Sequence, residues 1–121
     1  MKLSLVIPCY NEEDALQHTA PALATLMQDL IARRKITADS NIWFIDDGSK
    51  DATWPMIEAL TAQSDLYVGV KLSRNRGHQN ALLAGLLSAD GDAVISIDAD
   101  LQDDLSVIEQ MVDAYAAGYE I

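Results

Sequence analysis

Two carboxylates stand two positions apart at the end of an apolar run, a spacing that could do chemistry. Asp98 and Asp100 follow the run 93–97. In an extended segment, residues i and i+2 point the same way and lie about 7 Å apart, so both carboxylates can face one point while Ala99 turns away. Two such anions repel each other, and a divalent cation held together with a diphosphate relieves the repulsion. The pattern predicts a metal-assisted site for a phosphorylated ligand.

Two further residues could take part in this chemistry. Gln102 offers a neutral oxygen that could complete the shell of the cation. Arg74 belongs to the cationic stretch 73–78, and an arginine there could bind donor phosphates with two parallel hydrogen bonds. The alternative for Arg74 is a surface ion pair with neighbouring acids. Because Arg74 follows a predicted strand directly, we favour a functional role.

Strands and helices must alternate along the chain to position these side chains. Apolar runs typical of buried strands cover residues 3–7, 42–45, 67–72 and 93–97. Apolar residues at helical spacing predict helices at 12–33, 51–63, 78–89 and 104–117. This alternation predicts an α/β fold, a parallel sheet of about four strands with flanking helices. In such sheets ligands bind beyond the carboxyl ends of the strands, where residues 8–12, 46–49, 73–77 and 98–100 fall.

The segment after the first strand has two explanations. Asn11 followed by acidic residues is a good helix start, so Asn11 and Glu13 are either capping groups or ligand groups, and the sequence leaves both open. Tyr10 and Glu12 are the better candidates for ligand contact.

The segment after the second strand also contains both structural residues and a candidate for ligand contact. Asp47 and Ser49 are explained by a turn in which Ser49 or Asp51 caps the next helix. Asp46 is the first polar group past a buried strand, and its carboxylate could accept the imide proton of a pyrimidine base, which capping does not explain.

Composition limits the classes of protein. The chain has 121 residues, half of them apolar, which predicts a single domain over 1–121. A formal charge of −11 would repel nucleic acid and anionic lipid. We expect a soluble cytoplasmic chain, because no apolar stretch is long enough to cross a bilayer, no signal peptide is evident, and Cys9 is the lone cysteine. Cys9 and Trp43 are predicted to pack in the core, and the stretch 33–35 to be a solvated helix end without a partner.

Four stretches together resemble one family, the family 2 glycosyltransferases of the GT-A fold. They are residues 6–13, 44–51, 72–77 and 97–103, and they match the successive motifs of that family in order and spacing. A single Asp-x-Asp triplet is a weak signal, whereas four motifs in register are a strong one. The form of residues 98–102 resembles most the branch that transfers sugars from nucleotide diphosphates to polyprenyl phosphates.

The resemblance implies a role for each matching residue. Pro8, Tyr10 and Glu12 match positions that hold the base and ribose of the nucleotide, and Asp46 the position that reads the base. Asp98 would face the ribose or the metal, Asp100 and Gln102 would hold Mg²⁺ or Mn²⁺ on the diphosphate, and Arg74 would lie near the donor. The implied reaction is an inverting displacement at the anomeric carbon of a UDP- or GDP-sugar, for which Asp100 and Arg74 are the catalytic candidates.

The resemblance also implies that this chain is the N-terminal, donor-binding part of a GT-A domain and that the rest of the domain is missing. Family members continue with a further strand, an acceptor region and, in this branch, membrane helices, so the full-length protein is expected at the cytoplasmic face of the membrane. A parallel sheet that ends after four strands would leave apolar surface exposed. We expect this surface to be covered by a second copy of the chain, in a homo-oligomer, or by the missing remainder of the protein. The alternative function is a receiver-like phosphoacceptor signalling domain, which has similar length but places its acid pair after the first strand.

Overall fold

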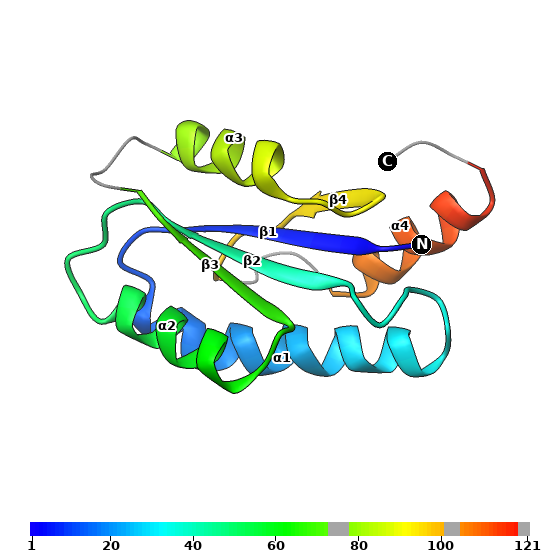
Figure 1. Cartoon of the computed structure of the whole chain (residues 1–121), viewed down its shortest axis with the longest axis horizontal. Coiled ribbons are helices and arrows are strands. Elements are labelled where there is room, and N and C mark those ends of the chain that lie inside the picture. The colour runs from blue at the N-terminus through cyan, green and yellow to red at the C-terminus, as the bar shows by residue number, and fades with distance from the viewer. Residues whose placement is uncertain (73–77, 101–104, 119–121) are drawn as a thin grey trace.

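The computed structural model describes residues 1–72, 78–100 and 105–118, which form a four-stranded parallel sheet with helices on both faces (Figure 1). In chain order the elements are β1 (Leu3–Cys9), α1 (Glu13–Ala32), β2 (Asn41–Asp46), α2 (Thr53–Gln63), β3 (Tyr67–Lys71), α3 (His78–Ser88), β4 (Ala93–Ser96) and α4 (Ser106–Ala116). All the predicted strands and helices are present, with ends shifted by no more than two residues. The predicted fold class is confirmed.

The strand order creates a natural place for a ligand. The sheet runs β3-β2-β1-β4, so the chain builds outward from β1 to β3 and then returns to pair β4 with the other side of β1. The helix α3 makes this return across the face opposite to α1 and α2 (Figure 1). The order therefore reverses between β1 and β4, and at such a point an open parallel sheet leaves a crevice beyond its carboxyl ends.

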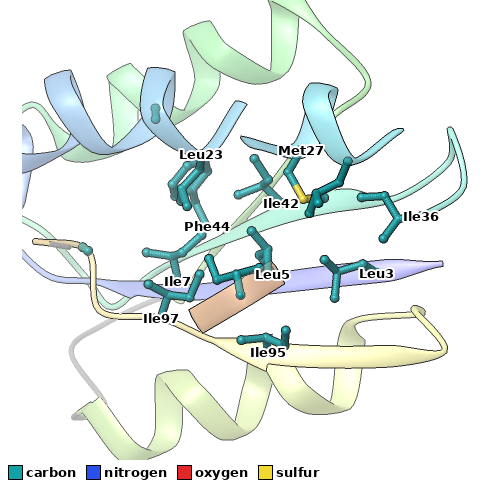
Figure 2. Packing of buried hydrophobic residues seen from close by; sticks show 14 of the residues in the cluster. Leu3, Leu5, Ile7, Leu23, Met27, Ile36, Ile42, Phe44, Ile95 and Ile97 are labelled. Atoms are coloured by element: carbon teal, nitrogen blue, oxygen red, sulfur yellow. The ribbon is translucent and has the colours of Figure 1, made fainter. Parts of the chain in front are cut away.

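Alternation along the strands divides the core between the two faces. Leu3, Leu5 and Ile7 of β1 point into the larger cluster, together with Phe44 of β2 and Leu23 of α1 (Figure 2). All five of these side chains are fully buried. The intervening Val6 and Ile45 enter a smaller cluster beneath α3, to which Trp43 also packs. Cys9 is buried in the larger cluster, so the predicted packing roles of Trp43 and Cys9 are confirmed.

The first strand passes through Pro8 instead of stopping there. Along β1, the carbonyl of Val6 accepts the N–H of Ile97 on the β4 side, whereas the carbonyl of Cys9 accepts the N–H of Asp47 on the β2 side. Pro8 therefore faces the side of β4, whose pairing with β1 ends at Val6 and Ser96. Because no ladder bond is needed there, proline costs nothing and β1 continues to Cys9.

The helix α3 covers its face of the sheet closely but leaves leucines in solvent. A Cβ atom on Gly85 would lie 2.3 Å from Cγ1 of Val6, so only glycine allows this approach. On the outer side, Leu83, Leu86 and Leu87 are 53%, 43% and 78% exposed. These leucines lie on α3 and not at the end of the sheet, so the expected apolar surface at the end of the sheet and self-association through it stay predictions. Neither α3 nor any other helix in the described part of the chain has the length and apolar character of a membrane span.

The basic end of α1 is not simply solvated, and that prediction is wrong. Arg33 and Lys35 both bind Glu109 of α4, at 2.6 and 2.8 Å, and Lys35 also binds Asp113 at 2.9 Å. Arg33 further pairs with Asp29 one turn earlier, at 2.6 Å. The sequence could not show the pairs with Glu109 and Asp113, because these partners lie more than seventy positions away. The network holds α4 against α1.

We expect the stability contributed by this network to disappear in acid. Hydrogen bonds from Arg33 and Lys35 lower the pKa of Glu109 from 4.5 to about 2. A carboxyl group with a lowered pKa in the folded state stabilises the fold above its usual pKa, and this contribution is lost as the pH falls from 4.5 through about 2. The melting temperature of Glu109→Gln should therefore be lower than that of the unmodified protein at pH 6 and equal to it near pH 2. An equal difference at both values would contradict this.

Candidate functional site

The loops after β1 and β2 are tied together at the carboxyl edge of the sheet. The backbone N–H of Asn11 donates to Oγ of Ser49 at 2.9 Å, and the N–H of Lys50 donates to Oδ1 of Asn11 at 2.8 Å. Asn11 has a φ of 53°, a left-handed conformation that asparagine adopts more readily than most residues. The N-cap of α1 is Glu12, without a side-chain capping bond, so the capping alternative for Asn11 is wrong.

Asp51 serves the first residues of two helices at once. Its carboxylate accepts the N–H of Glu13 at 3.3 Å and the N–H of Thr53 at 2.9 Å. Thr53, whose hydroxyl also donates to Asp51, accepts the N–H of Glu12 at 2.8 Å. Partial burial works to raise the pKa of Asp51, but these hydrogen bonds outweigh it and lower the pKa. The N-cap of α2 is Ala52, without a side-chain capping bond, so the prediction that Ser49 or Asp51 caps this helix is wrong. Asp51 instead joins the start of α1 to the start of α2.

Glu12 stands in an acidic environment at the carboxyl edge of the sheet, where β1 and β4 are neighbours. Burial raises the pKa of its carboxyl group, and the negative charges of Asp100, Asp51 and Asp98 raise it further. These charges act across the point where the strand order reverses, since Glu12 follows β1 and the two aspartates at 98 and 100 follow β4. Of the predicted site residues, Asp98 and Asp100 therefore act on Glu12 through their charges.

The turn after β4 displays its two aspartates and buries the residue between them. Asp98 and Asp100 are exposed, whereas Ala99 is 3% exposed and belongs to the larger core cluster. The carbonyl of Ala99 accepts a hydrogen bond of 2.5 Å from the hydroxyl of Thr19 on α1. The expectation that Ala99 turns away from the carboxylates is confirmed.

The remaining predicted site residues lie at or beyond the same edge. Tyr10, directly after β1, is 39% exposed, while Pro8 is buried within β1. Asp46 ends β2 and is fully buried, and its two carboxylate oxygens accept the N–H of Ser49 at 3.3 Å each. Asp46 thus has a structural role in its own turn as well. Arg74 and Gln102 lie outside the described residues.

The chemistry of this edge is that of oxygen ligands. In the part of the chain that the structure describes, no three side chains of histidine, cysteine, aspartate or glutamate are grouped to hold a metal ion by themselves. One or two carboxylates completed by phosphate oxygens and water are the usual set for Mg²⁺ and Mn²⁺, and exposed Asp98 and Asp100 could supply them. The residues present fit a cation that binds together with a phosphorylated ligand.

The chain shares its fold with solved structures of longer proteins. It superposes on TarS 1–349 of S. aureus in complex with UDP with a TM-score of 0.68 and 23% identity, over 96% of this chain and 33% of that one. It also superposes on the mannosyltransferase PcManGT of Pyrobaculum calidifontis in complex with GDP-Man and Mn²⁺, with a TM-score of 0.63 and 24% identity, over 82% of this chain and 27% of that one. At these identities the likeness concerns the fold.

The sequence profile of glycosyl transferase family 2 matches residues 4–121, and the chain belongs to this family. It is 50% identical to the uncharacterized glycosyltransferase YkoT of Bacillus subtilis, over 98% of this chain and 36% of that protein. It is 41% identical to the bactoprenol glucosyl transferase of Shigella phage SfV, over 100% of this chain and 38% of that protein. It is 39% identical to an undecaprenyl-phosphate 4-deoxy-4-formamido-L-arabinose transferase of Aeromonas hydrophila, over 98% of this chain and 35% of that protein.

Two consequences follow from the match. The family resemblance read from the four motifs is confirmed, and the receiver-like alternative is set aside because the matching family is one of glycosyltransferases. The chain spans about a third of the length of the curated relatives it matches.

Sequence reasoning did not find three residues that shape this site: Thr19, Asp51 as a link between helices, and Thr53. Thr19 and Thr53 are buried polar residues at 2% and 0% exposure, in helices whose buried positions are otherwise apolar. A threonine on the apolar side of a helix, facing the site edge, was the signal that could have found them.

Proposed function

We propose that this chain is the donor-binding part of a glycosyltransferase that uses a UDP- or GDP-sugar. The observation that carries the proposal is that β4 lies beside β1, so that Asp98 and Asp100 follow the strand next to the one that Glu12 follows, in a chain that belongs to glycosyl transferase family 2. Solved structures of the same fold contain UDP or GDP-Man, which supports a nucleotide diphosphate as the ligand.

The nucleoside would lie against the residues that follow β1 and β2. Exposed Tyr10 offers an aromatic face, and the partly buried Glu12 carboxylate can accept hydrogen bonds from ribose hydroxyls. Asp46 would read the base through its carboxylate, with buried Pro8 shaping the floor. Asp98, which is exposed just after β4, would face the ribose or the cation.

The diphosphate would lie beyond β4 with Mg²⁺ or Mn²⁺, held by Asp98, Asp100 and Gln102. A structure of similar fold holds Mn²⁺ with GDP-Man, which supports a divalent cation here. When bound, the cation supplies positive charge that stabilises the departing nucleoside diphosphate. Arg74, which follows β3 in the chain, would add a second positive charge to the same phosphates. This assigns Asp100 and Arg74 to the leaving-group side of the reaction.

The acceptor in the whole protein is proposed to be a polyprenyl phosphate at the cytoplasmic face of the membrane. Relatives named for bactoprenol and undecaprenyl phosphate support this substrate class. An acceptor phosphate oxygen would attack the anomeric carbon, the bond to the nucleoside diphosphate would break, and the configuration would invert. Because a phosphate is already an anion near neutral pH, the reaction needs no strong general base.

Calorimetry with UDP, GDP and their sugar conjugates, with and without Mn²⁺, tests the proposal. We expect one of the two nucleotides to bind, and its affinity to rise when Mn²⁺ is present, because a cation held by the carboxylates would offset their repulsion of the diphosphate. Binding should also raise the melting temperature. The absence of binding by both nucleotides, with Mn²⁺ present, would contradict the proposed function.

A further inference from the structure

We propose that Thr19 is a positioning residue that aims the Asp98 and Asp100 carboxylates, an inference that rests on the proposed function. Thr19 lies on α1, eighty positions before Ala99 in the sequence, and its hydroxyl donates a hydrogen bond of 2.5 Å to the Ala99 carbonyl. Ala99 is the residue between the two aspartates. The bond therefore acts on the backbone to which both carboxylates are attached.

The location of this bond explains why the turn needs an anchor. The ladder between β1 and β4 closes with the N–H of Ile97 on the carbonyl of Val6, so the backbone of Ala99 lies beyond the sheet. Thr19 and Ala99 are 2% and 3% exposed, whereas the flanking aspartates are exposed. A methyl group packed in the core and a carbonyl bonded to α1 fix the middle of the turn, and the carboxylates then point outward.

The hydroxyl of Thr19 is not explained by the helix itself. A threonine inside a helix commonly returns its hydroxyl to the carbonyl four residues earlier, and this bond gives no stability. Here the hydroxyl leaves the helix for the turn after β4. An apolar residue would suit the surroundings of Leu16, Ala20 and Leu23 better, since these neighbours are buried in the core cluster.

The helix α1 therefore connects Glu12 with the turn that carries the two aspartates. Its N-cap residue is Glu12, and Thr19 lies about two turns further along. Because α1 is one rigid element, the bond from Thr19 to Ala99 sets the separation between Glu12 and the aspartate pair. A ribose at Glu12 and a cation at the two aspartates can belong to one bound nucleotide only where this separation is held.

The test compares Thr19→Val, which keeps the shape of the side chain and removes the hydroxyl, with Thr19→Ser, which keeps the hydroxyl. Mn²⁺ binding in the presence of UDP or GDP is followed by the electron paramagnetic resonance of free Mn²⁺, and metal-free nucleotide binding by calorimetry. We expect Thr19→Val to weaken Mn²⁺ binding about tenfold, as for residues that orient metal ligands, with metal-free nucleotide binding unchanged. Thr19→Ser should bind Mn²⁺ like the unmodified protein.

Controls separate positioning from stability. Thr61→Val makes the same change at an exposed helical threonine whose hydroxyl bonds Glu58 within α2, and it should change neither measurement. If Thr19→Val does not fold, Thr19→Ala against Thr19→Ser gives a second pair that differs by one hydroxyl. Equal Mn²⁺ affinity with and without the hydroxyl, or equal loss of metal-free and metal-dependent binding, would overturn the inference. If the unmodified protein binds neither nucleotide with Mn²⁺, the proposed function itself fails.

Discussion

Replacing Asp100 with alanine should remove the metal-dependent part of nucleotide binding and leave the metal-free part in place. Asp100 is exposed at the end of β4, and its charge reaches Glu12 across the crevice. A carboxylate is the preferred ligand of a hard cation, and even residues that only support such ligands change metal affinity by 10 to 100-fold. We therefore expect Asp100→Ala to weaken Mn²⁺-dependent binding of UDP or GDP by about 100-fold or more, measured by calorimetry.

Asp65→Ala is the matched control for this variant. Asp65 is an exposed aspartate between α2 and β3, at the amino edge of the sheet, so its replacement makes the same change in net charge away from the site. It should leave binding unaltered with and without Mn²⁺. If Asp100→Ala retained the gain in affinity that Mn²⁺ gives, the proposed role of Asp100 as a metal ligand would be wrong.

Local patterns were enough to predict the elements of this fold. A strand such as β1 is buried on both sides, so its apolar run stands out, and α4 repeats its buried residues Ile108 and Val112 at helical spacing. The spacing of Asp98 and Asp100 likewise predicted a buried residue between two exposed acids. The strand predicted over 3–7 is two residues too short, because a proline such as Pro8 ends a strand only where its missing N–H would have had a partner.

Long-range pairing could not be predicted, and it decides how the site is assembled. The strand order places β4 beside β1, and only this order brings Asp98 and Asp100 near Glu12. In the same way, Asn11 looked like a helix cap because its partner Lys50 is 39 positions away. A short polar side chain has several possible partners, and the fold chooses among them.

Replacing Glu12 with glutamine should stabilise the metal-free protein while weakening nucleotide binding. Burial and the charges of Asp100, Asp51 and Asp98 raise the pKa of Glu12 above its usual 4.5. A carboxyl group that holds its proton more tightly in the folded state loses stability as it ionises, so Glu12 destabilises the fold once the pH rises through its raised pKa. Glutamine removes that charge, and the melting temperature of the metal-free protein should rise at pH 7. Below the usual pKa both states are protonated, and the gain should vanish.

The same substitution should cost affinity, because a neutral amide replaces the carboxylate proposed to accept hydrogen bonds from the ribose. Hydrogen bonds to charged groups contribute more than neutral ones, and we expect nucleotide binding to weaken about tenfold or more. Glu58→Gln, an exposed change of equal charge on α2, should alter neither stability nor binding. A lower melting temperature for Glu12→Gln at pH 7 would show that the ionised carboxylate of Glu12 does not destabilise the fold. Opposite signs for stability and binding would instead identify a group whose unfavourable environment is maintained because the donor needs it.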